Sequence, residues 1–243
     1  MDHIVGRTWS ALPADVRPAQ KTWDKQGRAR LRQLLQGDER LACPAVENPT
    51  VSFIVVLHNG AHLSLLSLES IIANADVSYE LIVVDNGSSD ETSLMLDRLQ
   101  GAKIIRNLTN VGFGPACMQA AADAAGEYLC FFNNDALLGS AAISTALANF
   151  VNSTVGAVGG KILLANGALQ EAGNIVWSDG SALGYGRGHD PQSPKYDFRR
   201  PVDYCSAVFL VTRRRLFAEF GGFSSDFAPA YYEDADYCMT LWQ

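Results

Sequence analysis

The sequence lacks the features typical of zinc-binding, membrane-spanning and secreted proteins. Its five cysteines are scattered along 243 residues without a Cys-x-x-Cys pair, which argues against a zinc site and fits reduced thiols in a cytosolic protein. No apolar run approaches the ~20 residues of a membrane span. Residues 1–4 lack the charged and apolar regions of a signal peptide. We therefore expect a cytoplasmic protein without a transmembrane segment, and peripheral association with the inner face of the membrane remains open.

The chain also lacks an excess of basic residues. It has 19 Lys and Arg against 26 Asp and Glu, which gives a formal net charge of -7. A general nucleic-acid binder needs a basic surface, so we expect no nucleic-acid partner. A small phosphorylated ligand remains compatible, because a cation can bridge an acidic protein and an acidic ligand.

Residues 1–48 differ in composition from the rest of the chain. The stretch 21–41 is rich in Arg, Lys, Gln and Leu, with three leucines at helical spacing and a glycine that then breaks the pattern. This predicts an N-terminal helical extension and linker over 1–48, followed by a single domain over 49–243. The residues of this pattern are Leu31, Leu34, Leu35, Gly37 and the later breaker Pro44.

From residue 51 onward, apolar β-branched runs alternate with segments of helical spacing. This alternation predicts an α/β fold with right-handed crossovers and a mostly parallel central sheet flanked by helices. A capping box at 88–91 predicts a helix that continues to residue 99. The segment 178–201 is predicted to be a long loop. The predicted strands are 51–57, 80–84, 103–106, 128–132, 155–164 (broken at Gly159-Gly160) and 204–212. The other predicted helices are 63–73, 113–125, 141–150, 213–220 and 235–243.

Three polar clusters follow three of the predicted strands, and parallel strands would bring them to one edge of the sheet. The first carries a ring that can stack on a base, His58, and the second a carboxylate that can accept from a base or sugar, Asp85. The third ends in Asp135, a hard oxygen ligand for a divalent cation that also binds phosphates. Turn formation and helix capping remain the alternatives for these residues.

A fourth cluster, residues 231–236, is acidic and opens the last predicted helix. One interpretation is structural: Asp234 and Glu233 would stabilise the helix because negative charges are favourable in its first turn. A general base for a hydroxyl acceptor is the other interpretation, because neighbouring acids raise one another's pKa.

The order of these motifs resembles glycosyltransferase family 2, and more narrowly its bacterial rhamnosyltransferase and O-antigen biosynthesis branch. The resemblance covers residues 51–243. Its motifs are Val-Ser-Phe-Ile-Val-Val-Leu-His-Asn (51–59), Ile-Val-Val-Asp-Asn-Gly-Ser-Ser-Asp (82–90), Asn-Val-Gly-Phe-Gly (110–114), Phe-Phe-Asn-Asn-Asp (131–135) and Tyr-Glu-Asp-Ala-Asp (232–236).

The resemblance implies a GT-A fold, a UDP- or dTDP-sugar donor, a Mg²⁺ or Mn²⁺ ion, and inversion by direct displacement. The acceptor would be a glycan or a lipid-linked glycan in polysaccharide or O-antigen synthesis. Asp135 would hold the metal, Asp234 would be the catalytic base with Glu233 beside it, and Asp85 would contact the base or ribose. The other implied donor contacts are His58, Asn59, Asn86, Asn110, Gly112, Asn133 and Asn134.

The sequence departs from the family pattern in three places. Asn133 stands where the metal motif usually begins with Asp, and Leu57-His58 replaces the commoner Thr-Tyr. Members also continue into another strand and a His-bearing loop, so we expect this chain to be C-terminally truncated relative to the family. Two alternatives stay open. One is a catalytically impaired nucleotide-sugar-binding module. The other is a nucleotidyltransferase, which would need a basic phosphate loop that residues 56–59 lack.

Overall fold

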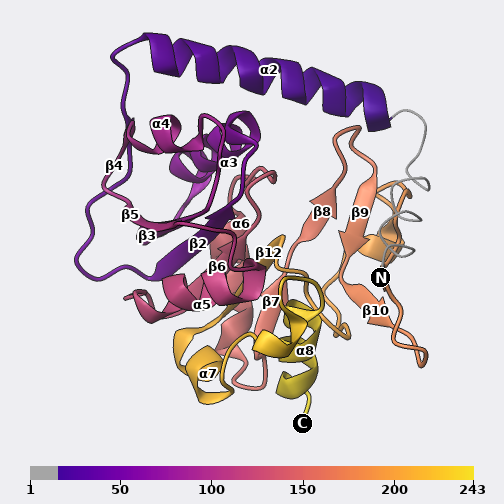
Figure 1. The fold of residues 1–243 in the computed structure, drawn as a ribbon. Coiled ribbons are helices and arrows are strands. Elements are labelled where there is room, and N and C mark those ends of the chain that lie inside the picture. The colour runs from indigo at the N-terminus through magenta and orange to yellow at the C-terminus, as the bar shows by residue number, and fades with distance from the viewer. Residues whose placement is uncertain (1–15) are drawn as a thin grey trace.

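The computed structural model describes residues 16–243. The prediction about the signal peptide, and the first part of the predicted extension, lie outside the described residues. Within 16–243, no helix is both long enough and apolar enough to cross a membrane. Figure 1 shows a central sheet covered by helices, with a smaller group of strands beside it.

The central sheet has six strands in the order β5-β3-β2-β6-β12-β7. The first four are mutually parallel, whereas β12 runs antiparallel to both β6 and β7. The sheet is therefore mixed but mostly parallel, as predicted. Its strands are β2 (Val51–Leu57), β3 (Tyr79–Asn86), β5 (Lys103–Asn107), β6 (Tyr128–Phe132), β7 (Ala157–Gly159) and β12 (Phe209–Arg213).

Helices bury both faces of this sheet (Figure 1). Phe53 and Val55 of β2 pack into a core with α2, α3, α4 and α6, while Ile54 and Val56 pack into a second core with α5, α7 and α8. This is the two-sided burial expected for a continuous apolar strand. The helices are α2 (Val16–Gln36), α3 (Ala61–Asn74), α4 (Thr92–Leu96), α5 (Phe113–Ala122), α6 (Ala142–Leu147), α7 (Arg214–Glu219) and α8 (Glu233–Leu241).

Helix α2 confirms the helix predicted in the N-terminal extension, and it packs along α3. Gly27 allows close approach, because a Cβ atom there would lie 2.7 Å from the carbonyl oxygen of His62. Leu34 is fully buried and belongs to the same core as α3, β2 and β3. Arg30 donates to Glu69 of α3 at 2.7 Å. The described part of the extension thus shares a core with the domain that follows it.

Short strands form a side layer next to the sheet, seen at the right of Figure 1. Strands β8 and β9 pair as one antiparallel hairpin, and β10 and β11 as a second. These strands are β8 (Lys161–Leu163), β9 (Leu169–Ala172), β10 (Asn174–Val176) and β11 (Ala182–Gly184). The remaining elements are strands β1 (Leu41–Ala42) and β4 (Leu99–Gln100), which pair in parallel, and the 3₁₀ turns η1 (Ala148–Val151), η2 (Pro194–Tyr196) and η3 (Ser225–Phe227).

Three local predictions were wrong. The capping box at 88–91 does not form, because the Ser88 hydroxyl accepts from the backbone N–H of Asn59 instead, and α4 ends at Leu96. The predicted strand 204–212 begins only at Phe209, since Tyr204 makes an isolated bridge to Asn174. The predicted loop 178–201 contains β11, which pairs with β10.

The burial of Leu34 predicts that α2 contributes to the stability of the whole domain. We expect Leu34→Ala to lower the free energy of unfolding by about 2–5 kcal/mol, because it leaves a cavity in the shared core. Leu94→Ala is the matched control, since Leu94 is 58 % exposed. Urea denaturation followed by tryptophan fluorescence measures both. Equal, small effects of the two variants would mean that α2 is not part of the core.

Candidate active site

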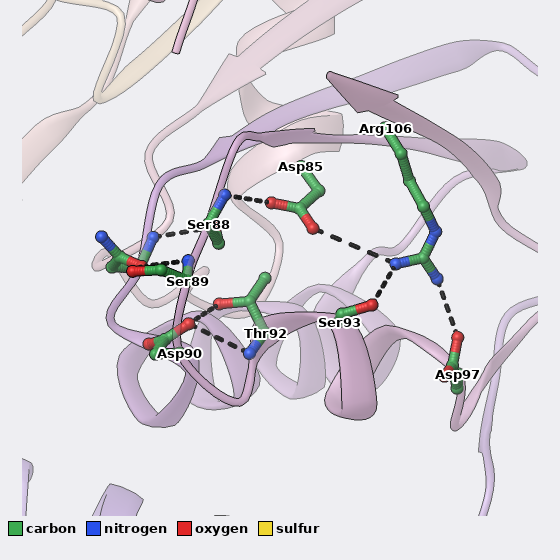
Figure 2. A network of polar contacts seen from close by, with 9 residues as sticks. Asp85, Ser88, Ser89, Asp90, Thr92, Ser93, Asp97 and Arg106 are labelled. Atoms are coloured by element: carbon green, nitrogen blue, oxygen red, sulfur yellow. Dashed lines mark hydrogen bonds and ion pairs between the residues drawn. The ribbon is translucent and has the colours of Figure 1, made fainter. Parts of the chain in front are cut away.

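Asp85 lies near the carboxyl end of β3, at the sheet edge where the sequence predicted a nucleotide contact. Its residue surface is only 6 % exposed. Its Oδ1 accepts from the backbone N–H of Ser88 at 3.0 Å, and its Oδ2 lies 4.0 Å from Nη1 of Arg106 (Figure 2). Arg106 is its direct register partner on β5. The carboxylate is therefore held in one orientation before any ligand arrives.

Asn86 joins the end of β3 to the loop that follows β5. Its Nδ2 donates to Asn110 Oδ1 at 2.9 Å and to the Gly112 carbonyl at 3.1 Å, and its Oδ1 accepts from Asn107 Nδ2 at 3.0 Å. With 2 % exposure, the side chain is committed to these contacts. The geometry supports a positioning role for Asn86, which holds the predicted contacts Asn110 and Gly112 beside Asp85.

A second set of hydrogen bonds joins the loops after β2 and β3 (Figure 2). Asn59, in a left-handed conformation with φ 60°, donates its N–H to Ser88 Oγ and accepts at Oδ1 from Ser89 N. Asp90 accepts from Ala61 N at 3.0 Å. Burial alone would raise the pKa of Asp90, but the hydrogen bonds it accepts lower that pKa below its usual value.

His58 is exposed at the same edge, beside Asp85. Its Nδ1 lies 3.0 Å from the carbonyl oxygen of Asn86. A carbonyl oxygen only accepts, so this ring nitrogen carries a proton. The exposed ring face is free for the stacking role predicted for it, and the hydrogen bond restricts its orientation.

The cluster 133–135 lies in a turn after β6, and α6 begins only at Ala142. Asp135 therefore does not cap a helix, which removes one of the two structural alternatives; the other, a role in the turn itself, fits its position. Asn133 Nδ2 donates to Asp135 Oδ1 at 2.7 Å, and Asn134 Nδ2 donates to Ser64 Oγ at 3.1 Å. Burial raises the pKa of Asp135, yet the residue keeps an exposed surface toward solvent.

The donor chemistry of this turn suits a hard divalent cation. Asp135 offers a carboxylate, and the neighbouring carboxamides offer further oxygen atoms. Among residues 16–243 there is no cluster of three or more His, Cys, Asp or Glu side chains that could form an all-protein metal cage. A cation here would need other ligands, such as water and the oxygens of a diphosphate, which is the usual arrangement for Mg²⁺.

Asp234 lies in the first turn of α8, and backbone N–H groups hold both of its oxygens. Oδ2 accepts from Ala207 N and Oδ1 from Ala235 N, both at 2.8 Å. Burial raises the pKa of Asp234, and these hydrogen bonds lower it in part. A carboxylate that is fixed in position and raised in basicity fits the predicted general base.

Glu233, the other predicted catalytic acid, faces inward. Its residue surface is 5 % exposed, and its Oε2 is buried without a hydrogen-bond partner. Burial, and then the neighbouring charge of Asp234, raises the pKa of Glu233 to about 7. A buried carboxylate without a partner is costly to ionise, so this group favours its protonated form.

One short segment connects the metal turn to the predicted base. We call residues 205–208 the bridge segment; it comes directly before β12. Ala207 donates its N–H to Asp234, and the carbonyl of the next residue, Val208, accepts from the N–H of Asn133 at 3.1 Å. A second contact joins the loop after β5 to the approach to α8, where Phe113 N donates to the Pro229 carbonyl at 2.8 Å. These contacts place both acidic clusters and the Asn110 loop around one region.

The sequence did not point to Arg106, or to Glu171 and its partner Ser206, as residues of this region. Arg106 stands opposite Asp85 in the β3–β5 pairing, and such register was not inferred. Glu171 of β9 is buried and accepts from Ser206 Oγ of the bridge segment at 2.6 Å. No strand was predicted at β9, and its sequence Leu-Gln-Glu-Ala does not alternate apolar and polar residues, so no local pattern marked Glu171 as buried.

The raised pKa of Glu233 predicts a pH-dependent stability difference. Between about pH 4.5 and 7, folded Glu233 keeps a proton that the unfolded chain has lost, so its contribution to stability falls as the pH rises. Glu233→Gln removes this cost. At pH 8 we expect its free energy of unfolding to exceed that of the wild type by about 1–3 kcal/mol, with similar values at pH 4. Denaturant titrations at both pH values measure this, and a constant difference at the two pH values would contradict it.

The chain resembles known proteins both in sequence and in fold. A family model described as glycosyl transferase family 2 matches residues 52–218. The protein y4gI of Sinorhizobium fredii is 26 % identical over 213 residues, 83 % of this chain and 23 % of its own length. The O-antigen biosynthesis protein RfbC of Myxococcus xanthus is 28 % identical over 199 residues, 77 % of this chain and 16 % of its own. The chain thus spans less than a quarter of either relative.

Among solved structures, the mannosyltransferase PcManGT of Pyrobaculum calidifontis, in complex with GDP-Man and Mn²⁺, is similar in fold. It aligns with a TM-score of 0.57 at 19 % identity, over 93 % of this chain and 61 % of that one. The predicted GT-A fold is confirmed by this likeness. Because the family model covers most of the sequence, the chain belongs to glycosyltransferase family 2.

Proposed function

We propose that this chain is an inverting, metal-dependent glycosyltransferase domain. It would transfer a sugar from a UDP- or dTDP-sugar to a hydroxyl group of a glycan or lipid-linked glycan, in the synthesis of a polysaccharide such as O-antigen. Family membership supports the transferase class. The similarity to a protein named for O-antigen biosynthesis supports the pathway, and the Mn²⁺ and GDP-Man of PcManGT support the type of donor and cofactor.

The single observation behind the proposal is that an exposed carboxylate at a strand end, Asp135, and a carboxylate held by backbone N–H groups, Asp234, are linked through one short segment. Asp135 is exposed and caps no helix, while both oxygens of Asp234 are held by backbone N–H groups. The bridge segment hydrogen-bonds to Asp234 and to Asn133 through consecutive residues. Two carboxylates at a fixed separation suit a reaction in which the diphosphate of the donor is bound at one carboxylate. The acceptor hydroxyl, activated by the other carboxylate, then attacks the sugar.

In the proposed reaction, Asp234 accepts the proton of the acceptor hydroxyl as its oxygen attacks the anomeric carbon. The bond from that carbon to the diphosphate oxygen breaks, and the diphosphate leaves with the electron pair. A Mg²⁺ or Mn²⁺ ion at Asp135 would neutralise the charge of this leaving group. His58 and Asp85 would bind the base and ribose, with Asn59, Asn110, Gly112 and the amides of Asn133 and Asn134 around the donor. A cytoplasmic location, with or without peripheral membrane association, is part of the proposal and rests on the resemblance.

Loss of the proposed metal ligand should weaken metal-dependent nucleotide binding strongly. We expect Asp135→Ala to weaken Mn²⁺-dependent binding of UDP or dTDP roughly tenfold or more, as measured by isothermal titration calorimetry. Asp123→Ala is the control, because Asp123 is an exposed carboxylate at the end of α5. Undiminished binding by Asp135→Ala would remove the metal assignment.

Loss of the proposed base should separate binding from turnover. Asp234→Asn keeps an oxygen that can accept from Ala207 N, so UDP or dTDP binding with Mn²⁺ should stay within about twofold of the wild type. Release of nucleoside diphosphate from dTDP-rhamnose or UDP-GlcNAc should fall roughly 10²- to 10⁴-fold. If the wild type binds the nucleotide but releases none from either donor, with or without a glycan acceptor, the chain is a binding module. Release of pyrophosphate from a nucleoside triphosphate would instead indicate a nucleotidyltransferase.

A further inference from the structure

The side layer of short strands contributes a buried acid whose contacts lead to the proposed base. Glu171 lies on β9 and is 7 % exposed. Its Oε1 accepts from Ser206 Oγ at 2.6 Å and from Asn174 Nδ2 at 3.2 Å. Gly184 of β11 covers it so closely that a Cβ atom there would lie 2.9 Å from the Cβ of Glu171. A glutamate is rarely buried this fully unless hydrogen bonds or ion pairs compensate for the loss of hydration.

The hydrogen bond from Ser206 connects Glu171 to the bridge segment. Ser206 lies between Cys205, whose N–H faces the Sγ of Cys238 on α8 at 3.5 Å, and Ala207, which donates to Asp234. Tyr204, just before the segment, exchanges backbone contacts with Asn174. The bridge segment therefore contacts the side layer through Ser206 and contacts α8 through Cys205 and Ala207.

We propose that Glu171 and Ser206 are a positioning pair for Asp234. Glu171 fixes Ser206, and this fixes the peptide N–H of Ala207 that orients the base. The inference rests on the proposed function of Asp234 and adds to it a role for the side layer. It also explains why an acid rather than an apolar residue occupies this position of β9, because the Ser206 hydroxyl and the Asn174 amide both require an acceptor.

Charge supports the same assignment. Burial raises the pKa of Glu171, hydrogen bonds from Ser206 and Asn174 lower it in part, and the charge of Asp234 raises it again. The two carboxylates therefore disfavour being ionised at the same time, so that removing one acid changes the titration of the other. Other titratable groups that interact with these two acids are Cys117 of α5, Glu233 of α8, Tyr204 before the bridge segment, Cys205 within it, and Arg187, which lowers the pKa of Glu171.

The test reads the Ala207 amide directly and needs no sugar substrate. In the wild type, the ¹H shift of this amide should titrate with Asp234, and the titration should vanish in Asp234→Asn. Glu171→Gln keeps an acceptor for Ser206 but removes the charge, so the midpoint should fall by roughly 0.5 to 1.5 pH units. Ser206→Ala breaks the connection and should reduce the amplitude of the titration. Glu219→Gln on α7, an exposed site, is the control and should change neither value.

Enzymatic measurements complete the test. We expect Ser206→Ala to lower the rate of diphosphate release about tenfold while binding of UDP or dTDP with Mn²⁺ is retained. An unchanged midpoint in Glu171→Gln would overturn the inference, and this near-isosteric variant remains informative even if Ser206→Ala does not fold. If the amide titrations behave as expected but the wild type releases no nucleotide, the proposed function fails and the positioning contact stands. If the wild type turns over and the titrations do not respond, only this inference fails.

Discussion

The parallel register of β3, β2 and β6 is the constraint on which the rest of the molecule depends. Leu57 pairs with Asp85, and Ile54 with Phe131, so that the loops after all three strands emerge at one edge. All seven residues of β2 are buried, because helices cover both faces of the sheet. A shift of one residue would exchange the two apolar cores, and it would also move the polar residues out of alignment. The same strand register therefore determines both the packing of the core and the position of the site.

The site edge is organised by hydrogen bonds before any ligand is bound. Asn86 ties the β5 loop to β3, and Ser88 and Ser89 tie the β2 loop to the β3 loop. Gly87 has φ 74°, and a Cβ atom there would lie 2.6 Å from the backbone of Thr109, so only glycine fits this close approach. Such preorganisation means that little conformational entropy is lost when a ligand orders these loops. Asn86, which the sequence predicted as a donor contact, thus holds Asn110 and Gly112 in place.

The antiparallel strand β12 positions the bridge segment, which connects the metal turn to α8. It adds to the parallel strands beside β6, and the bridge segment leads into it. Through that segment the metal turn, α8 and the side layer come into contact, although they are separated by many residues in the chain. The side layer belongs to the irregular second half of the sequence, and its buried Glu171 gives that half a role at the site.

The sequence by itself determined the α/β class, the main strands and helices of the first half of the domain, and the polar residues that follow those strands. These are local properties, since apolar runs, helical spacing and strand-end acids are read within a few residues. Only the tertiary structure decided that Asp135 caps no helix, that Asn86 is committed to internal hydrogen bonds, and that Ser88 binds Asn59 instead of capping α4. It also decided that Arg106 stands beside Asp85 and Glu171 beside the bridge segment. Each of these depends on contacts between segments far apart in the chain, whose register and burial no local pattern specifies.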